Sequence, residues 1–165
     1  MSGAKLRFKC VLFDWGGTLM SEEGPLDVPM ARWPEVHAID GAAETLAALY
    51  RTHGIALATN ASVSRRADIE LALERAALRK YVGEIFCFTE IGARKDSAEF
   101  WAEVLSTLEL KASEVAMVGD TLEQDVLGPR RWGIHSIWFN AAGSPGDARG
   151  APVVTRLRDV IPLLA

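Results

Sequence analysis

Five short, continuous apolar segments alternate along this chain with longer segments of helical periodicity. The apolar segments are residues 8–13, 55–59, 85–88, 115–118 and 134–139. A continuous apolar segment of this length is typical of a strand that is covered on both faces, as in a parallel sheet between helices. Strands that alternate with helices build strand–helix–strand units. The sequence therefore predicts a three-layer α/β fold with a central parallel sheet.

Four segments carry apolar residues three and four positions apart, which is the spacing of one helix face. They include residues 42–49, 69–76, 101–108 and 157–164. We expect Asp40 and Asp96 to cap the first and third of these helices. A further helix after Asp120 is expected to kink or to begin late at Pro129, because proline lacks an amide hydrogen and clashes with the preceding turn.

Length, charge and cysteine content narrow the class of protein. The chain has 165 residues, which favours one domain over residues 1–165. Its 18 Lys and Arg against 22 Asp and Glu leave no overall positive field for a nucleic acid. No segment approaches the ~18 apolar residues of a membrane span. Cys10 and Cys87 lie in apolar segments, where a thiol packs as a small hydrophobic group. We expect a cytoplasmic protein without nucleic-acid or membrane partners.

Polar residues stand at or soon after the ends of four predicted strands. Asp14 follows the first strand, Thr59 ends the second, Lys95 comes after the third, and Asp120 directly follows the fourth. The carboxyl ends of parallel strands form the ligand crevice of an open sheet. We therefore expect these four side chains to meet at one edge.

Each of these features also has an ordinary structural explanation. An aspartate before two glycines can shape a turn, Ser62 or Ser64 can cap the helix after Thr59, and a lone lysine is usually solvated. Asp120 and Asp125 can belong to an acidic loop. The same two carboxylates also suit magnesium, which prefers carboxylates together with water and substrate phosphate. The conjunction of the four strand ends favours a shared site.

Through the polar residues at these four strand ends, the sequence resembles the haloacid dehalogenase-like hydrolase superfamily, whose members are mostly magnesium-dependent phosphatases. The resemblance covers nearly the whole chain and implies a Rossmann-like domain. The matching positions are Asp14 with Thr18 for the first motif, Thr59 for the second, Lys95 for the third, and Asp120 with Asp125 for the fourth.

The resemblance implies a catalytic set. Asp14 would be the nucleophile that takes the phosphoryl group as an aspartyl phosphate. Thr59 and the backbone of Asn60 would bind the transferring group, and Thr18 is also placed among the residues that bind substrate. Lys95 would neutralise charge and hold Asp14. Phosphoryl transfer requires such a set, because its catalysis is mainly positioning and charge stabilisation.

The resemblance also implies a Mg²⁺ site. The cation would be bound by Asp14, by the backbone carbonyl of Gly16 and by Asp120, with Asp125 in direct or indirect support. Without the cation, an anionic nucleophile would be repelled by an anionic substrate.

Gly16 departs from the family pattern. Family phosphatases usually carry a second aspartate there, which acts as general acid and base, a contribution of roughly 10²–10⁴ in rate. We therefore expect activity to be weak, or selective for good leaving groups such as acyl and aryl phosphates. Glu22 or Glu23 can in principle restore a carboxyl group, or both can simply face water.

Residues 20–39 correspond to the segment that forms a flap in this family. The segment is too short for a separate cap domain, since units below ~40 residues rarely fold unaided. A capless site is open to phosphorylated small molecules and to phosphorylated macromolecules. It also disfavours phosphonate cleavage and dehalogenation, which depend on a cap or a closed pocket. Trp15 and Trp33 can line the entrance or belong to the core.

Two functions therefore stay open. The first is a magnesium-dependent phosphohydrolase that acts through an aspartyl phosphate. The second is a phosphate-binding or regulatory module that retains the metal site and lacks efficient turnover. Receiver domains also use Asp, Thr, Lys and magnesium, but their paired acids sit at the first strand and their acceptor Asp at a middle one, an order that this chain lacks.

Overall fold

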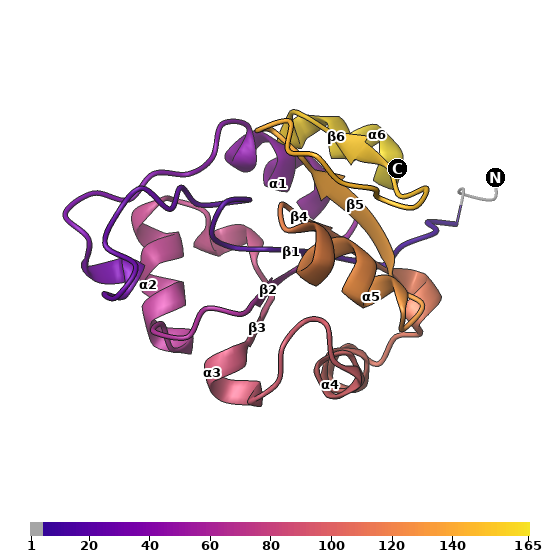
Figure 1. The fold of residues 1–165 in the computed structure, drawn as a ribbon, viewed down its shortest axis with the longest axis horizontal. Helices are drawn as coiled ribbons and strands as arrows, with labels where there is room; N and C mark the ends of the chain where they lie inside the picture. The colour runs from indigo at the N-terminus through magenta and orange to yellow at the C-terminus, as the bar shows by residue number, and fades with distance from the viewer. Residues whose placement is uncertain (1–4) are drawn as a thin grey trace.

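The computed structural model describes residues 5–165, and its centre is a parallel sheet of six strands in the order β3-β2-β1-β4-β5-β6 (Figure 1). The strands are β1 (Cys10–Phe13), β2 (Gly54–Thr59), β3 (Glu84–Cys87), β4 (Val115–Gly119), β5 (His135–Phe139) and β6 (Val153–Val154). The first five confirm the predicted strands. The sixth was not predicted, because two residues are too few to create a recognisable pattern.

Helices connect these strands. They are α1 (Ala42–Tyr50), α2 (Arg66–Arg75), α3 (Phe88–Ile91), α4 (Ala98–Leu108), α5 (Gly128–Arg130) and α6 (Ile161–Leu164). The late start expected at Pro129 is confirmed, since this residue lies in the first turn of α5. Before it, residues 122–127 form a π-helical turn. The predicted helix over 157–164 is instead a 3₁₀ turn that continues into the short α6.

Two expected helix caps were wrong. Gly41, with φ of +82°, occupies the N-cap position of α1, and no side chain caps this helix. Ser97 caps α4, because its hydroxyl oxygen accepts a hydrogen bond from the amide of Phe100 at 3.3 Å. A side chain reaches the free amides of the first turn only from the N-cap position itself. A shift of one residue therefore excludes Asp40 and Asp96.

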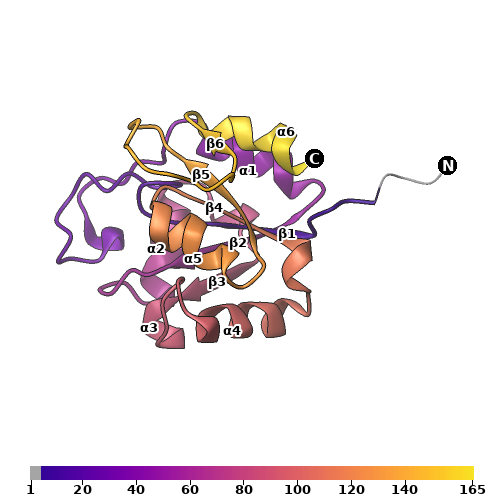
Figure 2. The ribbon, with the colours of Figure 1, turned by 45° about the vertical axis from the view of Figure 1, so that its right-hand side comes forward.

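Apolar side chains cover both faces of the sheet. Val11 and Phe13 of β1 belong to the cluster under α1, α2 and α6, whereas Cys10 and Leu12 belong to the cluster under α4. Figure 2 shows α1 and α6 on one side of the sheet and α4 on the other. Cys87 belongs to the first cluster, so the two free, buried cysteines pack as apolar groups on opposite faces.

The 20–39 segment lies beside α2, where both ribbon views show it (Figures 1 and 2). Its ends are joined by a bridge between Met20 and Ala38. The guanidinium group of Arg75 on α2 donates hydrogen bonds to the carbonyls of Ala31, Trp33 and Pro34 at 2.7–3.0 Å. The segment is therefore tethered to the body of the protein.

Among residues 5–165, no helix combines the length and apolar composition that crossing a lipid bilayer requires.

Candidate active site

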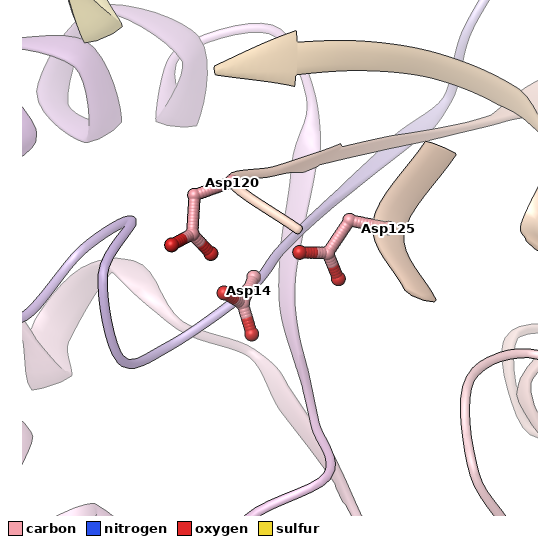
Figure 3. Close-up of side chains that lie close together, drawn as sticks. All are labelled: Asp14, Asp120 and Asp125. Carbon is pink, nitrogen blue, oxygen red and sulfur yellow. The ribbon is translucent and has the colours of Figure 1, made fainter. Parts of the chain in front are cut away.

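Three aspartates converge at the carboxyl edge of the sheet. Asp14 follows β1, Asp120 follows β4, and Asp125 lies on the π-helical turn. Figure 3 shows their carboxyl groups close together, and one oxygen of each lies within 4.8 Å of one oxygen of the others. Strands β1 and β4 are neighbours, and the amide of Asp14 donates to the carbonyl of Val118 at 2.9 Å. The parallel pairing therefore brings two strand ends together, as the sequence pattern predicted.

Lys95 joins two of these carboxylates. Its Nζ donates to Oδ1 of Asp14 at 2.7 Å and to Oδ1 of Asp125 at 2.6 Å, and the side chain is only 3% exposed. Burial alone would lower the pKa of Lys95, but the two carboxylates raise it above its usual value. The side chain is therefore a buried ammonium group rather than a solvated one.

Neighbouring residues fix the loop that carries Lys95. The amide of Lys95 donates to Oδ1 of Asn60 at 3.0 Å, and its carbonyl accepts a hydrogen bond from the indole of Trp101 at 2.7 Å. Nδ2 of Asn60 donates to Oε1 of Gln124 at 2.7 Å. The side chain of Asn60 thus ties three segments together, while its backbone remains for a ligand. Gln124 had no signal of its own in the sequence.

Asp125 is held by protein groups at both of its oxygens. Oδ1 contacts Lys95, and Oδ2 accepts from the amide of Thr121 at 2.9 Å. The side chain is fully buried. The wide π-helical turn directs it inward, and such turns often occur at functional sites.

Thr18 lies among the carboxylates rather than at the cavity. Its hydroxyl donates to Oδ2 of Asp14 at 3.1 Å, and it also lies 3.4 Å from Oδ1 of Asp120. The side chain is 0% exposed. The chain folds back after Trp15, whose carbonyl accepts from the amides of residues 19 and 20. Thr18 thus contacts Asp14 and does not line the cavity, where the sequence placed it among the residues that bind substrate.

Crowding of negative charge changes the acidity of this cluster. Burial, together with Asp14 and Asp125, raises the pKa of Asp120 to about 8. Burial and Asp14 raise the pKa of Asp125 to about 6, although Lys95 opposes this effect. The donor set consists of hard oxygen atoms, and Lys95 pairs with only two of the three carboxylates, those of Asp14 and Asp125. A set of this kind fits Mg²⁺.

A cavity of about 320 Å³ opens beside the cluster. Its polar wall includes Asp14, Gly16, Glu22, Thr59, Asn60, Ser62, Ser64, Lys95, Asp120, Thr121 and Gln124, and its apolar wall includes Trp15, Leu26, Val28, Met30, Trp33 and Val63. Most of the apolar wall comes from the 20–39 segment. Trp15 and Trp33 are buried in the hydrophobic core and also line the cavity, so both of the positions expected for them are found.

Thr59 and the serines after it lie at this cavity. The hydroxyl oxygen of Thr59 accepts from the amide of Ala61 at 3.1 Å, so its hydrogen remains to donate to a ligand. The alternative explanation, a helix cap at Ser62 or Ser64, does not hold, because Arg65 occupies the N-cap position of α2. Both serines instead line the cavity.

The two glutamates of the 20–39 segment differ in position. Glu22 lines the cavity, and burial and Asp14 raise its pKa against the opposing effect of Lys95. Both side chains are exposed to solvent, but Glu23 does not line the cavity, and its amide donates to the hydroxyl of Ser21. The sequence contains the acidic pair but does not distinguish between its members.

Comparisons with known proteins identify the family that this chain resembles. The family described as "Haloacid dehalogenase-like hydrolase" matches residues 29–139. The ribulose-1,5-bisphosphate 5-phosphatase of Halopiger xanaduensis is 34% identical over 108 residues, which are 64% of this chain and 44% of that protein. The pyrimidine 5'-nucleotidase YjjG of Escherichia coli is 31% identical over 62% of this chain and 45% of its own length. The chain thus spans less than half of these relatives.

A solved structure from Listeria monocytogenes serotype 4b has a similar fold. It superposes with a TM-score of 0.84 at 26% identity, covering 95% of this chain and 97% of its own. The similarity extends over nearly the whole sheet and its helices, so the architecture of residues 5–165 is one that recurs in solved proteins.

Proposed function

The chain belongs to the haloacid dehalogenase-like hydrolase family, and we propose that it is a magnesium-dependent phosphohydrolase that acts through a phosphorylated Asp14. The observation that carries the proposal is the contact between Asp14 and the buried ammonium of Lys95 at the wall of an open cavity. The phosphatase names of the curated relatives support the same class of reaction.

In the proposed reaction, a carboxylate oxygen of Asp14 attacks phosphorus and the leaving group departs. Lys95 and Thr18 hold the two oxygens of Asp14, at 2.7 and 3.1 Å, so the nucleophile needs little reorganisation. The hydroxyl of Thr59 and the backbone amide of Asn60 donate to the phosphoryl oxygens. Water then hydrolyses the aspartyl phosphate and releases inorganic phosphate.

We propose that Mg²⁺ is held by Asp14, Asp120 and the carbonyl of Gly16, all of which line the cavity. Asp125 supports the site indirectly, because its side chain is fully buried, does not line the cavity and holds Lys95. When bound, the cation offsets the negative charge of the carboxylates and of the substrate phosphate.

We also propose that residues 1–165 form one domain in which the 20–39 segment is a flap without a cap domain. The flap contributes the apolar residues Leu26, Val28, Met30 and Trp33 to the cavity wall. Lys95 is already paired with two carboxylates, and no other basic side chain among residues 5–165 lines the cavity. Such a wall favours a phosphate ester with an uncharged, partly apolar body, either free or on a macromolecule.

The test is hydrolysis of an aryl phosphate with and without MgCl₂ by the wild type, Asp14→Asn and the control Asp40→Asn, which changes an exposed carboxylate. We expect Mg²⁺-dependent turnover that Asp14→Asn reduces by at least about 10³-fold and that Asp40→Asn leaves unchanged. Turnover that survives Asp14→Asn would exclude the mechanism. A wild type that binds phosphate and Mg²⁺ without turnover would favour the regulatory module instead.

A further inference from the structure

Building on the proposed phosphohydrolase function, we infer that Glu22 of the flap is the proton donor to the leaving group and the base toward water. The space beside Gly16 is occupied by Glu22. A Cβ atom at position 16 would lie 2.0 Å from Oε1 of Glu22 and 2.7 Å from its Cδ. The carboxyl group of Glu22 therefore fills the space in which a side chain at position 16 would begin.

Backbone conformation does not explain the glycine at this position. Gly17 has φ of +81°, whereas Gly16 is not among the described residues with positive φ. A residue with a side chain is therefore compatible with the backbone at position 16, but its Cβ atom would displace the carboxyl end of Glu22 from the position that it occupies. Glycine here makes room for a carboxyl group that arrives from the flap.

Glu22 is the acid of the cavity wall that stands apart from the aspartate cluster. Of the titratable groups that line the cavity, Asp14 is bonded to Lys95 and Thr18, and Asp120 lies next to Asp14 and Thr18. Both aspartates are assigned to attack and to metal binding. Glu22 lines the same cavity from the flap. It is the carboxyl group placed to exchange a proton with the reacting ester.

Asp14 forms a bond to phosphorus, the bond from phosphorus to the ester oxygen breaks, and the carboxylic acid of Glu22 gives its proton to that oxygen to form an alcohol. Glu22 is then a carboxylate. It takes a proton from water while the water oxygen bonds to phosphorus, and the bond from phosphorus to Asp14 breaks. The products are the alcohol and phosphate, and both carboxyl groups return to their starting states.

The leaving group provides the test. An alkoxide leaves poorly without a proton, whereas a nitrophenolate leaves well. We expect Glu22→Gln to reduce kcat for an alkyl phosphate by about 10²–10⁴, while release of 4-nitrophenol in the first turnover falls by less than about tenfold. Hydrolysis of the intermediate also needs the base, so phosphorylated Asp14 should accumulate and appear in the intact mass of the protein. Glu23→Gln is the matched control and should behave as the wild type.

A second variant separates chemistry from folding. Glu22→Ala empties the space beside position 16, and adding Gly16→Asp then supplies a carboxyl group from the other side of the same space. We expect the double variant to turn over alkyl phosphate at least about tenfold faster than Glu22→Ala alone. A structural role for Glu22 would not be rescued in this way.

Three results would overturn the inference: an equal loss of the first-turnover rate on both substrates in Glu22→Gln, no loss at all, or no rescue by the double variant. Each of these leaves the proposed function intact if Asp14→Asn still abolishes turnover. A wild type that neither hydrolyses the aryl phosphate nor becomes phosphorylated would overturn both the proposed function and the role of Glu22.

Discussion

Gly119, the last residue of β4, makes room for Asp125 to fold back over the strand end. A Cβ atom at position 119 would lie 2.2 Å from Cγ and 2.5 Å from Cβ of Asp125. Gly119 is not among the described residues with positive φ. The glycine is therefore explained by the absence of a side chain, which leaves room for Asp125, and not by its backbone conformation. The contact lets a carboxylate from the π-helical turn reach Lys95 under the strand end.

Gly119→Ala should therefore displace Asp125 from Lys95 and from the amide of Thr121. We expect a loss of about 2–4 kcal/mol in the free energy of unfolding, because the site is overpacked and a buried ion pair is broken. Chemical denaturation measures the loss. Gly54→Ala is the control, since a Cβ atom there meets its nearest neighbour at an ordinary 3.5 Å, and it should change stability by less than about 0.5 kcal/mol. Equal effects of the two substitutions would contradict this account.

Lys95→Met should remove the shared partner of Asp14 and Asp125. Leaving buried carboxylates unpaired costs about 3–5 kcal/mol, and we expect a destabilisation of this order together with loss of turnover. The double variant Lys95→Met with Asp125→Asn removes one of the stranded charges. It should be more stable than the sum of the single effects predicts, as a double-mutant cycle would measure. Strict additivity would mean that Lys95 and Asp125 are not energetically coupled.

The acidic cluster should make stability depend on pH and on magnesium. The pKa of Asp120 is raised to about 8 and that of Asp125 to about 6, mainly by burial, against about 3.9 in an unfolded chain. The native protein thus binds more protons than the unfolded chain between about pH 4 and pH 8. Its stability without metal should fall as pH rises through this range.

Added MgCl₂ should raise Tm more at pH 8 than at pH 5, because ionised carboxylates bind the cation and protonated ones do not. Thermal unfolding in a chelator and in MgCl₂ measures both effects. Asp120→Asn should weaken the pH dependence and the magnesium shift, whereas the exposed control Asp40→Asn should change neither. A magnesium shift of the same size in Asp120→Asn would speak against this residue as a ligand.

Arg75 should control the flap from outside the cavity. Its guanidinium donates to three flap carbonyls, so Arg75→Met should lower protection from hydrogen exchange over residues 25–34. We expect stability to fall by about 1–3 kcal/mol and kcat/KM to fall with it, because the flap carries Glu22 and the apolar wall. The exposed control Arg51→Met should leave exchange in the flap unchanged. Unaltered exchange in Arg75→Met would show that other contacts hold the segment.

The sequence alone determined the sheet and much of the convergence at its edge. Short continuous apolar segments between helical ones are typical of strands covered on both faces, and parallel strands bring their carboxyl ends to one edge. Asp14, Lys95 and Asp120 could therefore be assigned to one place without knowledge of the structure. The short β6, the caps of α1 and α4, and the broken helix over 157–164 could not, because single residues decide them.

Only the tertiary structure decided the direction of individual side chains. In the structure the hydroxyl of Thr18 contacts Asp14, and both oxygens of Asp125 accept hydrogen bonds from protein groups. Glu22 lines the cavity, whereas Glu23 does not. These outcomes depend on contacts between distant segments and on the space left by Gly16 and Gly119. A linear pattern records which residues are apolar or charged, but close packing in three dimensions determines which atoms share a given space.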